Sequence, residues 1–307
     1  FNYSGDNNQP KHIVLISRGG PDSTIIDCEG NESAFEIMSG TDTTLQIIGF
    51  KIINGWSQSP EMGSAITILS FGEEESRAAF KNCIIENGDG YGPAVSIRGG
   101  TGIFRDCVIR NNRHEANGDN LGIGSDINAG GFHVQSLLYG GVDTYGKLLL
   151  DRCKVVSNYI DYSGATSPYN CNPRGAGIFA QTADIRIRNS LIADNYFTGS
   201  NTCGSGVAGL DGVNSEITLI NSTITGNQGY SGDDGSPSGF RANNYYYEND
   251  DYDTKTIIFN TIIAGNTPNS YQTDFDNAAT DYIALENSVF ENSTDDDWFD
   301  PDDGHYD

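Results

Sequence analysis

The chain has 307 residues and a formal net charge of −25, from 17 Lys and Arg against 42 Asp and Glu. A sequence pI near 4.2 opposes binding to nucleic acids and anionic membranes, because both attract clusters of Lys and Arg. The longest apolar runs, such as residues 13–16, are far too short to cross a bilayer, which excludes membrane insertion. The 38 glycines argue against a helical protein, since helix interiors resist glycine.

One pattern recurs eight times along the chain. An apolar segment is followed by an anchor residue, then by two or three mostly apolar residues, and by Asn four or five positions after the anchor. The anchors are Phe50, Cys83, Cys107, Cys153, Ser190, Ser222, Thr261 and Ser288. Their spacing varies between 24 and 46 residues, so each repeat has a short constant part and insertions of variable length.

A second expected strand precedes most copies of the pattern. These strands cover residues 65–68, 94–97, 131–134, 177–180, 206–209 and 239–242. Strands this short cannot bury an apolar face alone, whereas stacked repeats pair in parallel at ~4.8 Å and share one core. Equivalent Cys, Ser and Thr residues would then form an inward-facing ladder. Asn at a fixed corner tolerates left-handed backbone and can hydrogen-bond to its equivalent one repeat away.

The sequence therefore predicts an all-β fold, a right-handed parallel β-helix solenoid of about eight to nine coils with loop insertions. Three segments carry a resemblance: Gly19-Gly-Pro-Asp-Ser-Thr-Ile-Ile-Asp-Cys28, Gly49-Phe50-Lys-Ile-Ile-Asn-Gly55 and the strand start at residues 175–178. They resemble the pectin-lyase-like β-helix superfamily, and more narrowly the polymorphic-outer-membrane-protein-like repeats of secreted or surface bacterial proteins. The resemblance covers residues 13–293. It implies the fold and no single activity, because this fold carries lyases, hydrolases, adhesins and inert scaffolds.

The β-helix domain is expected to span residues 1–293 with a truncated first coil, followed by an acidic linker or tail at residues 294–307. Open ends of a solenoid would expose strand edges and aggregate. We therefore expect a piece of a longer chain, or a subunit whose ends are covered by neighbours.

The six cysteines fall into two kinds. Cys83, Cys107 and Cys153 share the anchor position and are expected to be buried as small hydrophobic residues. Cys171 and Cys203 lie in loops ahead of consecutive strands, so we expect a disulfide between them, in keeping with an oxidising extracellular compartment. No Cys or His pairs have zinc-site spacing.

A lyase on this fold needs a base, and a glycosidase needs paired carboxylates on one strand face. The outward column expected on the long parallel face holds no carboxylate pair, and it consists of Thr67, Ser96, His133, Phe179, Ala208 and Arg241. His133 with nearby Arg98 is the best candidate for a base and its partner, and His114 beside Glu115 is the second. The alternative for both is an incidental polar residue.

Two further groups are candidate binding residues. Tyr245, Tyr246 and Tyr247, close to Arg241, form an aromatic insertion suited to sugars or protein partners, or else pack back against the domain. A second group, Asp300, Asp302 and Asp303, resembles an Asp-rich calcium loop that lacks the bidentate Glu, and its alternative is a solvated linker. Calcium is the only cofactor expected.

We favour a non-catalytic, extracellular or cell-surface β-helix module, adhesin-like or filament-forming. Its expected partners are other copies of the chain, end to end, or surface glycans. The alternative is a carbohydrate-active enzyme, a polysaccharide lyase or glycoside hydrolase that acts in a loop-walled groove. Converging polar side chains beneath the insertions at residues 113–130 and 229–255 would favour the enzyme, and a flat ladder-lined face would favour the scaffold.

Overall fold

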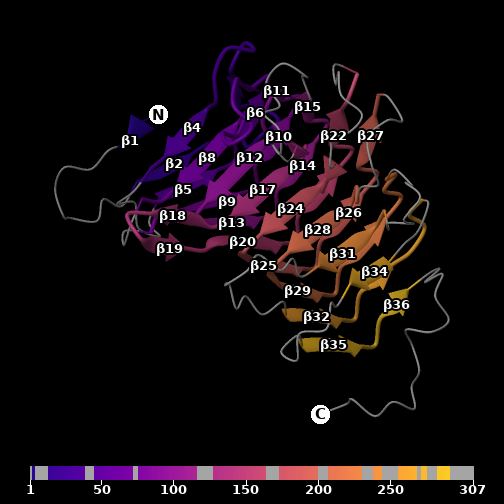
Figure 1. Ribbon diagram of the computed structural model, residues 1–307. Coiled ribbons are helices and arrows are strands. Elements are labelled where there is room, and N and C mark those ends of the chain that lie inside the picture. Colours follow the sequence, from indigo (N-terminus) through magenta and orange to yellow (C-terminus); the bar gives the residue numbers. More distant parts are fainter. Residues whose placement is uncertain are drawn as a thin grey trace, which may run out of the picture.

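The computed structural model describes residues 2–3, 13–38, 45–71, 75–115, 127–163, 173–199, 207–229, 238–243, 255–267, 271–274 and 282–290. All regular structure within these ranges is β-strand, which confirms the all-β prediction. Three sheets of nine strands account for most of it, and their pairings are parallel (Figure 1).

Sheet A contains β1 (Asn2–Tyr3), β4 (Phe35–Ile37), β8 (Ile66–Leu69), β12 (Val95–Arg98), β17 (Phe132–Gln135), β24 (Ile178–Gln181), β28 (Leu210–Val213), β31 (Phe240–Asn243) and β34 (Tyr271–Asp274). Sheet B contains β2 (Val14–Ile16), β5 (Leu45–Ile48), β9 (Arg77–Lys81), β13 (Thr101–Arg105), β20 (Gly146–Asp151), β25 (Ala183–Arg188), β29 (Glu216–Ile220), β32 (Lys255–Phe259) and β35 (Tyr282–Glu286). Sheet C contains β3 (Ile25–Asp27), β6 (Lys51–Ile53), β10 (Ile84–Glu86), β14 (Val108–Arg110), β21 (Lys154–Val156), β26 (Leu191–Ala193), β30 (Thr223–Thr225), β33 (Ile262–Ile263) and β36 (Val289–Phe290).

Four smaller sheets lie between these strands in the sequence. The first pairs β7 (Trp56–Ser57) with β11 (Asp89–Gly90), and the second has the order β15 (Arg113–Glu115), β22 (Tyr159–Asp161), β27 (Tyr196–Thr198). The other two pair β16 (Ile127–Asn128) with β23 (Pro173–Arg174) and β18 (Leu137–Tyr139) with β19 (Val142–Thr144). The last pair is an antiparallel hairpin. No helix of a length and hydrophobicity suited to crossing a bilayer occurs in the described part of the chain.

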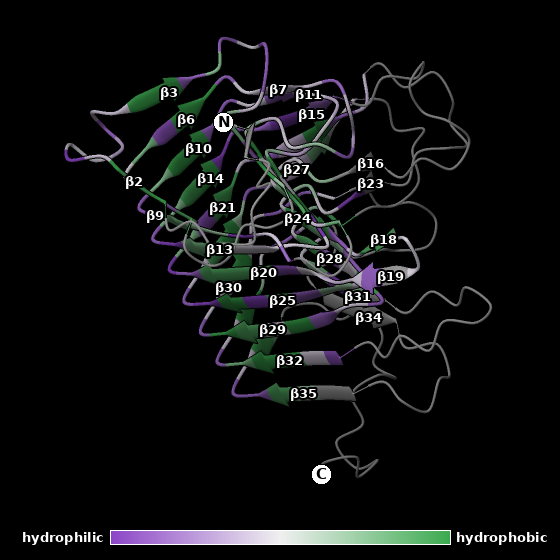
Figure 2. Cartoon of the chain, turned by 90° about the vertical axis from the view of Figure 1, so that its left-hand side faces the viewer, coloured by the Kyte–Doolittle hydropathy of each residue, from purple (hydrophilic) through white to green (hydrophobic). Residues whose placement is uncertain are grey.

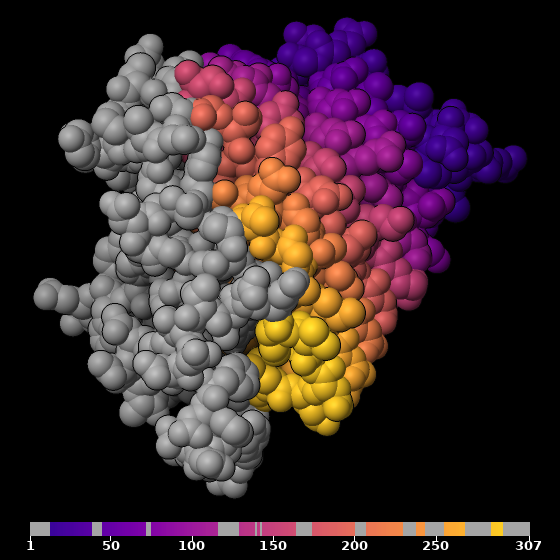
Figure 3. Space-filling view, turned by 90° about the vertical axis from the view of Figure 1, so that its right-hand side faces the viewer, coloured from indigo at the N-terminus to yellow at the C-terminus, as the bar shows by residue number. Residues whose placement is uncertain are grey.

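Each repeat of the sequence adds one strand to each large sheet, in chain order. Figure 2 shows the strands of sheet B stacked from β9 to β35, and Figure 3 shows the sequence colours in successive bands from indigo to yellow. Neighbouring strands of a sheet therefore come from neighbouring repeats. This arrangement is compatible with a parallel β-helix.

The core lies between the three sheets because every second side chain of a strand points inward. In sheet B, Phe80 and Phe104 are in register and stack with ring centroids 4.9 Å apart. Phe132 of sheet A meets Phe104 edge to face at 5.0 Å. All three side chains are at most 1% exposed. Burial of each stabilises the fold by about 1.5–3 kcal/mol.

The anchor residues form the predicted inward ladder. The side chains of Cys83, Cys107 and Cys153 are each 1% exposed, which confirms that they are buried. Further along, Ser190 Oγ accepts a hydrogen bond from Cys153 N at 3.0 Å, and Ser222 Oγ accepts one from Ser190 N at 3.3 Å. The adjacent thiols of Cys153 and Cys83, together with burial, raise the pKa of Cys107 far above its ordinary value, so this thiol stays protonated.

The corner Asn of the sequence pattern separates into two positions with different roles. One is the stacked position, where each amide nitrogen donates to the Oδ1 of the next amide at 2.8–3.1 Å. This ladder contains Asn112, Asn158, Asn195, Asn227 and Asn266. The left-handed residue is the one immediately before it, as at Asn111 and Asp194. The prediction that one Asn does both was therefore wrong.

One predicted strand is displaced. Residues 206–209 were expected to be extended, but β28 begins at Leu210, which is in register with Ile178. Gly209 directly precedes the strand, and a Cβ there would lie 2.0 Å from the carbonyl oxygen of Gly239. Only glycine fits this close approach, so Gly209 sets the start of the strand. Asp211 therefore occupies the outward column position that was predicted for Ala208.

Candidate functional site

The outer face of sheet A carries the column of side chains in which the sequence placed a catalytic site. The in-register residues are Glu36, Thr67, Ser96, His133, Phe179, Asp211 and Arg241. Thr67 and Ser96 are fully buried, and their hydroxyl groups form hydrogen bonds with backbone groups. Thr67 Oγ1 accepts from Gly63 N at 2.9 Å, and Ser96 Oγ donates to the carbonyl oxygen of Glu61 at 2.6 Å.

His133 and Arg98, the predicted base and partner, are joined through Gln135. With its amide nitrogen donating to His133 Nε2 at 3.0 Å, the Gln135 oxygen accepts from Arg98 Nε at 2.8 Å and from Nη2 at 3.2 Å. Arg98 also pairs with Glu61, with its Nη1 at 2.5 Å from Oε2. The structure thus brings the two residues into one network, in which both are held by other protein groups.

The His133 ring is buried, with 4% of its surface exposed, and it lies 5.3 Å from the Phe179 ring. Burial, reinforced by the positive charge of Arg98 and by His114, lowers the pKa of His133 to about 3. The imidazole is therefore neutral near pH 7. Because Nε2 accepts from Gln135, the neutral ring carries its proton on Nδ1, which is buried and has no hydrogen-bond partner.

Farther along the same column, Arg241 and Asp211 form a two-pronged ion pair. Arg241 Nε lies 2.9 Å from Asp211 Oδ1, and Nη2 lies 2.7 Å from Oδ2. The Asp211 side chain is fully buried and that of Arg241 is 11% exposed. Arg241, predicted to contact a ligand, thus neutralises a buried carboxylate.

His114 and Glu115 lie on β15 and point to opposite faces, because consecutive residues of a strand alternate. His114 is 2% exposed, and its Nδ1 lies 3.1 Å from the carbonyl oxygen of Ala129. Glu115 Oε2 lies 3.5 Å from Arg113 Nη1. The structure does not bring the imidazole and the carboxylate together as an acid–base pair.

The remaining predicted site residues lie outside the described residues. These are Tyr245, Tyr246, Tyr247, Asp300, Asp302, Asp303, Cys171 and Cys203. Within the described ranges, no group of three or more His, Cys, Asp or Glu side chains is arranged to hold a metal ion.

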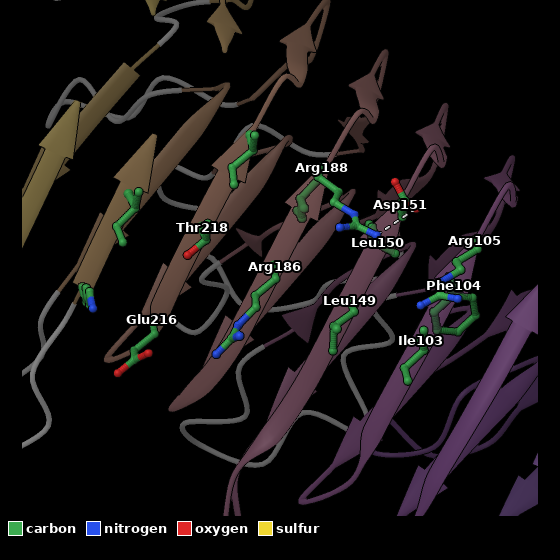
Figure 4. Close-up of a pocket in the computed structure, with 14 residues that line it drawn as sticks. Ile103, Phe104, Arg105, Leu149, Leu150, Asp151, Arg186, Arg188, Glu216 and Thr218 are labelled. Atoms are coloured by element: carbon green, nitrogen blue, oxygen red, sulfur yellow. Dashed lines mark hydrogen bonds and ion pairs between the residues drawn. The ribbon is translucent and has the colours of Figure 1, made fainter. Parts of the chain in front are cut away.

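The outer face of sheet B holds a groove of about 620 Å³ that the sequence did not predict (Figure 4). It crosses β13, β20, β25, β29 and β32, so five repeats contribute to it. Its middle row is mainly aliphatic and consists of Ile103, Leu149, Arg186, Thr218 and Ile257. We call this feature the sheet B groove.

Charged rows flank the aliphatic one on both sides. The first row is Lys81, Arg105, Asp151 and Arg188, and the other is Lys147, Asp184, Glu216 and Lys255. Arg188 Nη2 lies 3.2 Å from Asp151 Oδ2, as Figure 4 shows, and Arg186 Nη2 lies 2.9 Å from Asp184 Oδ2.

Outward positions of sheet B hold seven of the 17 Lys and Arg residues of this acidic chain. They are Arg77, Lys81, Arg105, Lys147, Arg186, Arg188 and Lys255. This face therefore concentrates much of the positive charge of an acidic chain, beside the acids Asp151, Asp184 and Glu216. The sequence signal for this concentration of cations was the alternation of charged and apolar residues in segments such as residues 184–188.

No protein-family model matches the chain, and neither a curated protein nor a solved structure matches it.

Proposed function

We propose that this chain is a non-catalytic β-helix module of an extracellular or cell-surface protein. In this proposal the three sheets form a right-handed solenoid of about eight to nine coils, of the pectin-lyase-like type with polymorphic-outer-membrane-protein-like repeats. The addition of one parallel strand per repeat to each large sheet supports the solenoid.

The observation that carries the non-catalytic function is the state of the polar side chains on sheet A. His133 is buried and neutral, Arg98 is held by Glu61 and Gln135, and Arg241 by Asp211. A general base must reach the proton that it abstracts, and it works best with a pKa near the operating pH. A buried imidazole with a pKa of about 3 meets neither requirement.

Contacts between copies, end to end, are part of the proposal. Large exposed aliphatic side chains occur in strands near both ends of the sheet order, namely Val14 and Ile16 in β2, Ile25 in β3 and Val289 in β36. Exposed apolar surface of this kind supports association. Surface glycans are the other proposed partner class, and calcium is the proposed ion.

A carbohydrate-active enzyme, a polysaccharide lyase or glycoside hydrolase, is the second candidate. One observation favours it: His133 Nδ1 is a buried polar atom without a partner, on the face of sheet A that carries the other converging charges. Unsatisfied buried groups of this kind are uncommon and cost free energy, so they are sometimes retained for function.

Electron microscopy of the purified chain, with size-exclusion chromatography in calcium and in chelator, tests the first proposal. Filaments or end-to-end contacts support the surface module, and monomers under all conditions contradict the association. A polysaccharide-cleavage screen tests the second candidate. Cleavage that is lost in His133→Ala and kept in Lys154→Ala, a surface control on sheet C, would establish the enzyme and overturn the non-catalytic proposal.

A further inference from the structure

Two exposed cations face each other on sheet B, and no carboxylate of the described residues is ion-paired with either of them. Lys81 of β9, one strand outside the sheet B groove, is in register with Arg105 of β13, which lines the groove, and both are exposed. The carboxylates next to Arg105 in sequence and in register, Asp106 and Asp151, are both held by Arg152, at 2.7 and 2.8 Å. Like charges directly opposite each other destabilise a sheet. An anionic group bound between them would remove that repulsion.

The rest of the sheet B groove restricts what such a ligand can be. Beside the two cations, Ile103 and Leu149 offer half-buried aliphatic side chains. On the opposite side, Asp184 and Glu216 are in register with each other. Lys147 and Lys255 lie at the two ends of that row. A ligand that keeps its negative charge on the Arg105 side, with apolar groups in the middle, avoids the two acids.

These demands separate the classes of acidic macromolecule. A polymer with an anion on every unit, such as an acidic polysaccharide or a nucleic acid, would place negative charge against Asp184 and Glu216 as well. A polypeptide can place carboxylates on one side and apolar or basic side chains on the other. An extended segment also suits the groove, which crosses five strands spaced by ~4.8 Å.

We propose that the sheet B groove binds an extended polypeptide segment of a partner protein, rich in acidic and aliphatic residues. Its carboxylates contact Lys81 and Arg105, and its aliphatic side chains lie on Ile103, Leu149 and Ile257. Charge complementarity sets the orientation of the segment, and the apolar row supplies the buried contact. The net charge of −25 repels acidic chains elsewhere on the molecule, so the groove selects where they bind. This inference goes beyond the proposed function and stands whether or not that function is correct.

The test measures the fluorescence anisotropy of a dye-labelled peptide built of Asp and Leu, titrated with the full chain at low salt. We expect saturable binding that weakens as salt is added. The same peptide with Asn in place of every Asp should not bind. Lys81→Glu combined with Arg105→Glu should weaken binding by about tenfold or more, because attraction is replaced by repulsion.

Two matched variants separate the groove from general electrostatics. Lys154→Glu makes one such charge reversal at an exposed strand lysine of sheet C and should leave the affinity within about twofold. Leu149→Asn changes no charge and should weaken binding, because it removes the apolar contact. Circular dichroism and urea midpoints establish that each variant is folded.

Three outcomes would overturn the proposal. The first is that the peptide does not bind, and the second is that Lys154→Glu loses as much peptide affinity as the groove variant. The third is that labelled polygalacturonate binds as tightly as the peptide, with the same dependence on Lys81 and Arg105. The last outcome would identify the groove as a site for acidic polysaccharide. None of these measurements depends on filaments or on polysaccharide cleavage, so failure here is distinguishable from failure of the proposed function.

Discussion

Replacing Asn195 by Ala would remove the middle step of the buried amide ladder. Asn195 is fully buried, and its Oδ1 accepts from the backbone N and the Nδ2 of Asn158 at 3.0 and 3.1 Å. Its own Nδ2 donates to the carbonyl oxygen of Val155 at 3.0 Å and to Asn227 Oδ1 at 2.9 Å. The substitution therefore deprives four neighbouring polar groups of one partner each.

The expected loss in the free energy of unfolding follows from the cost of leaving a buried polar group without a hydrogen-bond partner, which is about 1–3 kcal/mol for each group. The Asn158 and Asn227 amides keep their other hydrogen bonds, such as Asn158 Nδ2 to the carbonyl oxygen of Ile109 and Asn227 Nδ2 to Asn266 Oδ1. The four losses are therefore not fully additive. We expect the free energy of unfolding to fall by about 3–6 kcal/mol.

Equilibrium unfolding in urea, followed by circular dichroism, measures this change. Asn31→Ala is the control, because Asn31 is exposed and its amide only donates to the carbonyl oxygen of Glu29 at 3.2 Å. The control should lie within about 0.5 kcal/mol of the native protein. A loss below about 1 kcal/mol for Asn195→Ala would refute the idea that the ladder stabilises the stack.

Three other substitutions test the packing and electrostatics. Phe104→Ala should lower the free energy of unfolding by about 3–5 kcal/mol in urea, because it opens a cavity beside a fully buried ring stack. Asp211→Asn should lower the thermal midpoint by several degrees, since it leaves the Arg241 guanidinium without a neutralising carboxylate; an unchanged midpoint would contradict the role of the pair. The low pKa of His133 means that the unfolded chain binds a proton below about pH 6.5 that the folded chain binds only near pH 3. The contribution of neutral His133 to the free energy of unfolding is therefore complete above pH 6.5, and it falls by up to about 1.4 kcal/mol per pH unit as the pH drops toward 3. Urea unfolding of His133→Asn across this range should show a shallower pH dependence than the native protein, and equal slopes would contradict the lowered pKa.

The repeat could be predicted from the sequence because each anchor repeats the same inward position. Cys107 and Ser190 occupy equivalent corners although insertions separate them, and both are buried. The strand at residues 206–209 was misplaced for a physical reason that spacing alone does not reveal. Several glycines, among them Gly206 and Gly209, offered a strand start, and spacing does not show that Gly209 is the one that closely approaches the Gly239 carbonyl.

The catalytic column could be predicted from single strands, whereas the groove depends on the register between strands that are far apart in the sequence. His133 could be assigned to an outward position from the alternation of one strand, and Arg98 follows two residues after the equivalent position in the preceding repeat. Lys81, Arg105 and Arg188 are separated by 24 and 83 residues. Insertions of different lengths lie between them, so only the strand pairing places the three cations in one row.

Two outer faces of the same stack thus carry cations in opposite electrostatic states. On sheet A, Arg241 forms an ion pair with a buried carboxylate of the protein itself, so this favourable interaction already stabilises the folded chain. On sheet B, Lys81 and Arg105 repel each other until an anion arrives, so their favourable interaction is available only to a ligand. Removal of the Asp211 charge should therefore reduce stability, and removal of the Lys81 or Arg105 charge should leave or improve it. A charge reversal on sheet B that weakened peptide binding while leaving the urea midpoint unchanged would show that the second face is built for recognition.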